Sequence, residues 1–168
     1  TEVEESDINP VKLALSTTTF KKEEYIVPNI DLVKREVLGS SDSIAEAFHM
    51  FVVDNGCTLD AEALSDDGVT VLPNKNVGGA GGFARGMMEA LASSEGYTHI
   101  LLMDDDVKIS AESLKRTYNL LALAKGDYRD AFINGAMLAI EQPNLQFEDV
   151  SFVIKSGAYR RVKEDKLY

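Results

Sequence analysis

The sequence predicts an α/β fold in which a largely parallel sheet is flanked by helices. Segments that favour strands and helices follow one another in the order strand, helix, strand, strand, helix, strand, helix, strand. The run Ile100–Met103 is apolar without interruption, which is typical of a strand covered on both faces of a parallel sheet. Polar clusters directly follow the predicted strands, where ligands of such sheets bind.

The first predicted strand, residues 11–16, is apolar, and the polar residues 17–22 after it predict a turn. A helix is predicted from Glu23 to Leu38, ending before Gly39. Pro28 is tolerated because it lies in the first turns of that helix. The apolar positions of the helix fall on one face: Ile26, Ile30, Val33 and Val37.

The middle of the chain predicts two more strands and a glycine-rich helix. Residues 50–53 form a strand that ends at the turn signal Asp54-Asn55-Gly56, and residues 69–72 form the next strand. The glycines at 78–82 then open a helix that continues to about Ser93. Its predicted buried stripe consists of Phe83, Met87, Ala90 and Leu91.

The remaining elements follow the apolar run at 100–103. Ser110 is predicted to cap a helix that ends near Gly126. Further strands are predicted at residues 131–140 and 150–154. The buried face of the helix is expected to carry Leu114, Tyr118 and Leu121.

Charge and cysteine content restrict the function. A net charge of -11 argues against nucleic acid as a partner and repels any phosphate-bearing ligand, so a nucleotide ligand would require a divalent cation. The single cysteine, Cys57, excludes an internal disulfide and a thiolate metal cluster, and it favours a reduced, cytoplasmic compartment. The sequence has no apolar run of about 18 residues. It leaves open a peripheral association with the inner face of a membrane through regions outside the chain.

The triplet Asp104-Asp105-Asp106 ends the apolar run and is the strongest candidate for chemistry. An unpaired carboxylate is costly to bury, so three in succession indicate a cation, either a metal ion or basic side chains. The first and third carboxylates of Asp-x-Asp can reach one ion, and oxygen ligands suit Mg²⁺ or Mn²⁺. The alternative is an acidic turn that ends a strand and caps the next helix.

The glycine-rich segment also has two interpretations. Its backbone N–H groups at a helix start could contact a diphosphate or sugar. Alternatively, the glycines allow the start of the helix to pack tightly on the sheet. Asp54 could bond the N–H of a nucleobase or could be a turn residue, and Lys21 and Lys22 are either a solvated pair or phosphate contacts.

Together these segments resemble the family 2 glycosyltransferases of the GT-A (Rossmann-like) fold, and in particular the bacterial galactofuranosyltransferase and rhamnosyltransferase branch. The resemblance covers roughly residues 11–145. The residues that carry it are 18–22, 52–56, 76–86 and 100–107.

The resemblance implies a set of site residues. Asp104 and Asp106 would hold the metal that bridges the diphosphate of the nucleotide. An arginine is usual in this branch where Lys22 stands, and a lysine does not reproduce its planar fork. The implied nucleotide-binding residues are Thr17, Thr19, Lys22, Asp54, Asn76, Asp104 and Asp105. The implied sugar or diphosphate loop consists of Gly78, Gly79, Gly81, Gly82 and Arg85.

The same resemblance implies an inverting, Mn²⁺- or Mg²⁺-dependent hexosyltransferase of bacterial cell-wall polysaccharide biosynthesis. Its donor would be a UDP- or dTDP-linked sugar, galactofuranose or rhamnose, and its acceptor a glycan or lipid-linked glycan. Residues 1–10 would be an acidic linker and residues 11–168 the nucleotide-sugar-binding part of a longer protein. The two alternatives are a nucleotidyltransferase and a non-catalytic nucleotide-binding α/β domain.

The general base that such an enzyme needs is not found among the motifs. An acidic base and a metal-binding histidine are expected beyond Tyr168, because Glu148-Asp149 lies too close to the acidic triplet. The 168-residue chain alone is therefore expected to bind a donor but to turn it over poorly or not at all.

Overall fold

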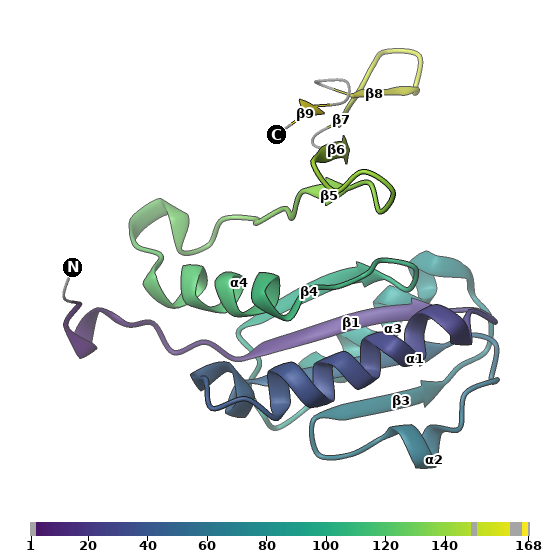
Figure 1. The fold of residues 1–168 in the computed structure, drawn as a ribbon, viewed down its shortest axis with the longest axis horizontal. Coiled ribbons are helices and arrows are strands. Elements are labelled where there is room, and N and C mark those ends of the chain that lie inside the picture. Colours follow the sequence, from purple (N-terminus) through teal and green to yellow (C-terminus); the bar gives the residue numbers. More distant parts are fainter. Residues whose placement is uncertain (1–2, 149–150, 162–165, 168) are drawn as a thin grey trace. The chain divides into compact units, whose positions relative to one another are not determined.

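The computed structural model describes residues 3–148, 151–161 and 166–167 of the chain. It divides into two compact units, Thr1–Arg129 and Asp130–Tyr168, which are described separately (Figure 1). The first unit contains the sheet and all the candidate site residues.

The first unit is built on a four-stranded parallel sheet with strand order β3-β2-β1-β4. Its strands are β1 (Leu13–Thr19), β2 (Phe48–Asp54), β3 (Val69–Pro73) and β4 (His99–Asp104). In the register of the sheet, Thr18 lies opposite Val53 of β2 on one side and opposite Asp104 of β4 on the other. Helices flank this sheet, so the predicted α/β, Rossmann-like fold class is confirmed.

Helices connect the strands in the predicted order. The α-helices are α1 (Glu23–Leu32), α2 (Ala61–Leu64), α3 (Gly78–Ala92) and α4 (Ala111–Leu123). Helix α1 continues as a π-helical segment, η2 (Val33–Leu38), up to Gly39, as predicted. The 3₁₀ turns are η1 (Glu5–Asp7), η3 (Ser43–Glu46) and η4 (Gly126–Tyr128). Ser110 occupies the N-cap of α4, although its side chain makes no capping hydrogen bond.

Helix α1 covers one face of the sheet, and its apolar side chains form the main core with those of α4 and the strands (Figure 1). The four predicted core positions of α1 and η2 are fully buried, because their spacing of three and four residues keeps them on one side of the helix. Leu114 and Leu121 of α4 are buried in the same cluster, and Tyr118 packs against it, as predicted.

Helix α3 covers the opposite face, and glycines form much of its contact with the sheet (Figure 1). Gly82, Gly86 and Ala90 are its buried residues. A Cβ atom added at Gly82 would clash with the Thr18 hydroxyl and lie 2.7 Å from Thr18 Cβ. Of the predicted apolar stripe only Ala90 is buried: Phe83 and Met87 are half-buried and Leu91 is 76% exposed, because the glycines of α3 lie nearest the sheet.

Strand β4 forms one edge of the four-stranded sheet. Leu102 is 50% exposed, and of the strand's six residues only Met103 is buried. The prediction that this strand is covered on both faces is therefore wrong within the described part of the chain. The apolar run is therefore an edge strand with Met103 buried on one face and Leu102 half exposed on the other.

The strands of the second unit, in the residues that the structure describes, are short and antiparallel. They are β5 (Met137–Leu138), β6 (Leu145–Glu148) and β9 (Lys166–Leu167) in one sheet, and β7 (Ser151–Val153) with β8 (Tyr159–Arg161) in a hairpin. The predicted strand at 131–140 is wrong outside residues 137–138, since residues 131–136 and 139–140 do not adopt strand structure. The strand predicted at 150–154 is confirmed at 151–153, and residue 150 lies outside the described residues.

No helix within residues 3–148, 151–161 and 166–167 combines the length and apolarity needed to cross a bilayer.

Candidate functional site

The candidate site lies where the order of the sheet reverses. The chain runs from β1 to β2 to β3 in one direction, and α3 then carries it back across the sheet to β4 on the other side of β1. Open α/β sheets bind ligands at the carboxyl ends of the strands beside such a reversal. Here that position is occupied by residues 20–22 after β1 and residues 104–106 at the end of β4.

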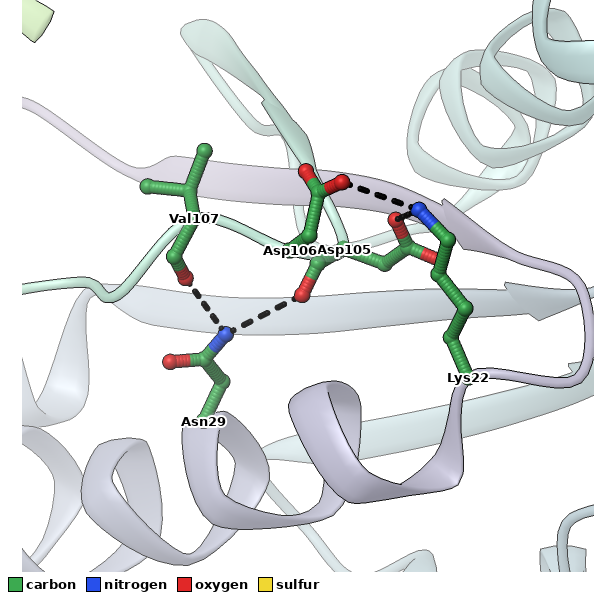
Figure 2. Close-up of polar contacts among 5 residues, drawn as sticks. All are labelled: Lys22, Asn29, Asp105, Asp106 and Val107. Atoms are coloured by element: carbon green, nitrogen blue, oxygen red, sulfur yellow. Dashed lines mark hydrogen bonds and ion pairs between the residues drawn. The ribbon is translucent and has the colours of Figure 1, made fainter. Parts of the chain in front are cut away.

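The acidic turn at the end of β4 contacts Lys22. The Lys22 ammonium lies 3.3 Å from Asp105 Oδ1 and 2.9 Å from Asp106 Oδ2 (Figure 2). Asp105 is buried, whereas Asp104 and Asp106 are exposed. The cation beside the triplet in the structure is therefore a lysine, one of the two kinds of cation that the sequence indicates.

This ion pair shifts the protonation equilibria of its members. Hydrogen bonds to Asp106, and then to Asp105, raise the pKa of Lys22 above its ordinary value of 10.5. The hydrogen bond from Lys22 lowers the pKa of Asp106 below 3.8. Both shifts favour the charged forms, so the lysine and the carboxylate remain ionised at neutral pH.

Asn29 of α1 holds the backbone of this acidic turn. Its Nδ2 donates to the carbonyl of Val107 at 2.8 Å and to that of Asp105 at 3.4 Å (Figure 2). The Asn29 side chain is buried, although it lies on the same helix as the apolar core positions. No motif in the sequence singles out Asn29; the available signal was a polar residue one position before Ile30, on the buried side of a predicted helix.

Asp54 at the end of β2 organises the loop that follows it. It is fully buried, and its carboxylate accepts hydrogen bonds from the backbone N–H groups of Gly56 (2.9 Å), Thr58 (2.7 Å) and Leu59 (2.8 Å). These contacts are those of a turn residue, the alternative that the sequence left open. Contact between Asp54 and a nucleobase stays a prediction.

Asn55 links three elements at the site, a role that the sequence pattern did not predict. Its Nδ2 donates to the Gly78 carbonyl (3.1 Å) and lies 3.3 Å from Thr18 Oγ1, and its Oδ1 accepts from Asn74 Nδ2 at 2.8 Å. The buried Asn55 therefore joins the ends of β1 and β3 to the start of α3. Its position directly after a predicted strand was the only signal in the sequence.

The glycine-rich start of α3 separates into two parts. Gly78 and Gly79 are exposed, and an added Cβ atom at either would meet no neighbour within 4 Å. The Gly78 N–H bonds Asn76 Oδ1 at 3.0 Å, and Gly78 has a φ of +75°. Gly81 lies against Val77, and Gly82 lies against β1. The tight-packing interpretation thus holds for Gly82, while the backbone at the very start of the helix is accessible to a ligand.

Three other predicted residues have clear positions. Thr17 and Thr19 belong to β1, so the predicted turn at 17–22 is wrong at its first residues; both hydroxyls are buried and have no hydrogen-bond partner among the described residues. The β-branched threonines pair with β2 in register, which extends the strand through them. Arg85 of α3 forms an ion pair with Glu89 at 2.5 Å.

The arrangement of carboxylates suits only one kind of metal binding. Nowhere in the described ranges do three His, Cys, Asp or Glu side chains converge as the complete shell of a metal ion would require. Mg²⁺ is commonly bound by one or two carboxylates, with waters and substrate phosphates completing its shell. The exposed Asp104 and Asp106 therefore fit a metal ion that shares its coordination with a phosphate ligand.

A separate cavity of about 730 Å³ lies around the amino ends of the strands, remote from the acidic turn. Its lining includes His49, Phe51 and Tyr97, whose rings pack against one another at centroid distances of 4.5–6.2 Å. None of the predicted site residues lines this cavity.

Sequence comparison relates the chain to glycosyltransferases. It is 31% identical over 117 residues to galactofuranosyltransferase GlfT2 of Mycolicibacterium smegmatis, a match that covers 70% of this chain and 17% of that protein. Against galactofuranosyltransferase GlfT2 of Mycobacterium tuberculosis it is 35% identical over 69 residues, covering 41% of this chain and 10% of that protein. The chain thus spans less than a fifth of the length of these relatives. No protein-family model matches the chain.

Proposed function

We propose that this chain is the nucleotide-sugar-binding part of a metal-dependent, inverting glycosyltransferase of the GT-A fold. The donor is a UDP- or dTDP-linked sugar, galactofuranose or rhamnose, and the acceptor is a cell-surface glycan or its lipid-linked precursor. The observation that carries this proposal is that the acidic turn and the accessible glycines both follow strands at the carboxyl edge of one parallel sheet. Similarity to two galactofuranosyltransferases supports it.

Charge balance explains the role of each part. A chain with a net charge of -11 repels a nucleoside diphosphate, so a divalent ion at Asp104 and Asp106 is needed to hold it. When bound, the ion supplies Lewis-acid stabilisation of the leaving diphosphate. The N–H of the exposed Gly79 at the start of α3 provides a second contact for the same anion, whereas the N–H of Gly78 already bonds Asn76 Oδ1.

The nucleoside would lie beside the ends of β1, β2 and β3. Asn76 is exposed and can offer its amide to the nucleotide, whereas Asp54 would act mainly by fixing the loop that follows β2. Asn55 positions the start of α3 relative to β1.

The transfer itself would be one displacement. A base removes the proton of the acceptor hydroxyl, whose oxygen attacks the anomeric carbon while the bond to the nucleoside diphosphate breaks. No residue of this chain is assigned as that base. We place the reaction in bacterial cell-wall polysaccharide synthesis at the cytoplasmic face of the membrane, on the strength of the resemblance and the single cysteine.

Isothermal titration with UDP in the presence and absence of Mn²⁺ tests the proposal. UDP should bind only with Mn²⁺, and Asp104→Ala combined with Asp106→Ala should abolish that binding. Asp31→Ala combined with Glu62→Ala removes the same charge from exposed helix positions and should leave binding nearly unchanged. Equal binding by the wild type and the Asp104/Asp106 variant would contradict the proposal, and preference for UTP over UDP would favour a nucleotidyltransferase.

A further inference from the structure

We propose that Lys22 is the counter-ion that a divalent cation displaces from the acidic turn, so that Lys22 sets the metal affinity of the site. This inference rests on the proposed function, because it takes Asp104 and Asp106 as the metal-binding pair. It adds a residue that opposes metal binding, where the resemblance alone suggested a contact to the nucleotide.

The contact between Lys22 and the acidic turn supports this role. The ammonium lies 2.9 Å from Asp106 Oδ2 and 3.3 Å from Asp105 Oδ1, so it already neutralises part of the charge that would attract a metal ion (Figure 2). Asp106 is common to this ion pair and to the proposed metal pair. A divalent ion bound to Asp106 would therefore share a carboxylate with the lysine.

The two cations cannot both hold this position favourably. A divalent ion bound to Asp106 would repel the ammonium paired with the same carboxylate, and its double charge doubles the repulsion that two unit charges would have at that distance. Without either cation, the buried Asp105 would lack a neutralising partner, which is costly. Exchange of the lysine for the divalent ion avoids both the repulsion between the two cations and the cost of leaving the acidic turn without a cation.

The structure also shows which partner can move. The Lys22 side chain is 42% exposed and lies at the N-cap of α1, with a flexible aliphatic stem. The acidic turn is held by hydrogen bonds from Asn29 to the carbonyls of Asp105 and Val107. We therefore place the movement in the lysine: its ammonium leaves Asp106, while the carboxylates stay in position.

The neighbouring lysine provides a matched control. The Lys21 ammonium lies 5.4 Å from the centre of the Phe20 ring, and its described contacts do not include the acidic turn. Lys21→Met removes the same charge from the same loop, so it separates loss of the ion pair from a general change in potential.

Mn²⁺ binding to the 168-residue chain, followed by electron paramagnetic resonance without any nucleotide, tests the exchange. Lys22→Met should tighten Mn²⁺ binding by about tenfold, and Lys21→Met by less than about twofold. Lys22→Arg should bind Mn²⁺ no more tightly than wild type, because its planar fork can hold two carboxylates. In the Asp106→Asn background, Lys22→Met should gain much less, because the shared carboxylate is absent. Thermal unfolding of each variant shows that it is folded.

Distinct outcomes separate the inference from the proposed function. If wild type binds Mn²⁺ and Lys22→Met binds it no more tightly, or if Lys21→Met tightens binding equally, the exchange is overturned and the metal site remains. If neither wild type nor any variant binds Mn²⁺, the metal of the proposed function fails and the exchange fails with it.

Discussion

The two faces of the central sheet are covered in different ways. On the α1 face, large apolar side chains of α1, η2, α4 and the strands form one extended cluster. On the α3 face, the buried cluster contains only Ala14, Phe51 and Ala90, and glycines bring the helix close to β1. The first face gains stability from apolar burial; the second places the glycine-rich start of a helix beside the ends of the strands.

This difference separates stability from ligand access. Apolar burial contributes roughly 25 cal/mol per Å², so the α1 face carries most of the stabilisation. On the α3 face the backbone packs closely on β1 at Gly82, while Gly78 and Gly79 are exposed at the candidate site. Shortening a buried side chain should therefore be most costly on the α1 face, whereas enlarging a buried residue should be costly on the α3 face.

The largest effect is expected on the α1 face. Ile30 is fully buried, so Ile30→Ala should lower the free energy of unfolding by about 3 kcal/mol through lost burial and a cavity. On α3, Leu91→Ala removes a side chain that is 76% exposed and should change it by no more than about 0.5 kcal/mol. Urea unfolding measures both. Comparable losses in the two variants would contradict the described difference between the faces.

Enlarging a residue should be costly on the α3 face. Gly82→Ala places a methyl group against Thr18 and should lower the free energy of unfolding by about 2 kcal/mol. Gly79→Ala, in the same helix, meets no neighbour and should be neutral or stabilising by about 0.5 kcal/mol. Chemical denaturation of the two single variants gives the comparison, and equal effects at both positions would show that α3 does not pack closely on β1.

A smaller effect is expected where β2 ends. Asp54→Asn replaces one acceptor oxygen by a donor amide facing backbone N–H groups, and it should cost about 1.5 kcal/mol of unfolding free energy. Asp60→Asn, at an exposed N-cap bonded to the Ala63 N–H, should cost little, because asparagine also caps helices well. An Asp54→Asn variant as stable as wild type would show that its hydrogen bonds do not order the loop.

The smallest expected effect is the pH dependence of His49, which packs against Phe51 on the α3 face. Burial lowers the pKa of His49 below its ordinary 6.5, so the unfolded state binds a proton more readily. The free energy of unfolding should fall as pH drops through 6.5 toward the folded-state pKa, and His49→Gln should remove part of that decline. If the unfolding free energies of wild type and His49→Gln fell equally with decreasing pH, His49 would not be a source of the decline.

The α1 face could be predicted from the sequence because its signal is local. Apolar residues at three- and four-residue spacing identify Ile26, Ile30, Val33 and Val37 as core, and all four are buried. The buried stripe predicted for α3 was wrong because a glycine has no apolar side chain that would mark the buried side of a helix. Gly82 and Gly86 nevertheless make the closest approach of α3 to β1.

Strand predictions failed where pairing decides the structure. Apolarity suggested a strand over residues 131–140 and cover on both faces for β4, yet only residues 137–138 of the first segment pair as a strand and Leu102 of β4 is half exposed. Both outcomes depend on neighbouring elements, which the local pattern does not encode. The prediction of the fold class was nevertheless correct, because it depends on the order of the strands and helices and not on the burial of each one.

The candidate site was predictable in position but not in its contacts. Strand ends locate the acidic triplet, Asp54 and the glycines, since parallel strands share a carboxyl edge. The pairing of Lys22 with Asp105 and Asp106 joins residues more than eighty positions apart. The contacts of Asn29 with Val107 and of Asn55 with Gly78 also join residues of different elements, 78 and 23 positions apart. Local patterns do not encode such partners.

The central claim is that a nucleoside diphosphate and a divalent ion bind together at the carboxyl edge of the sheet. Amide NMR of the ¹⁵N-labelled chain, titrated with UDP and Mg²⁺, tests it most directly. We predict that the largest shifts occur at Gly78, Gly79 and residues 104–106 and require both ligands. Shifts that centre instead on the cavity around His49 and Tyr97, or no shifts with either ligand, would contradict the account.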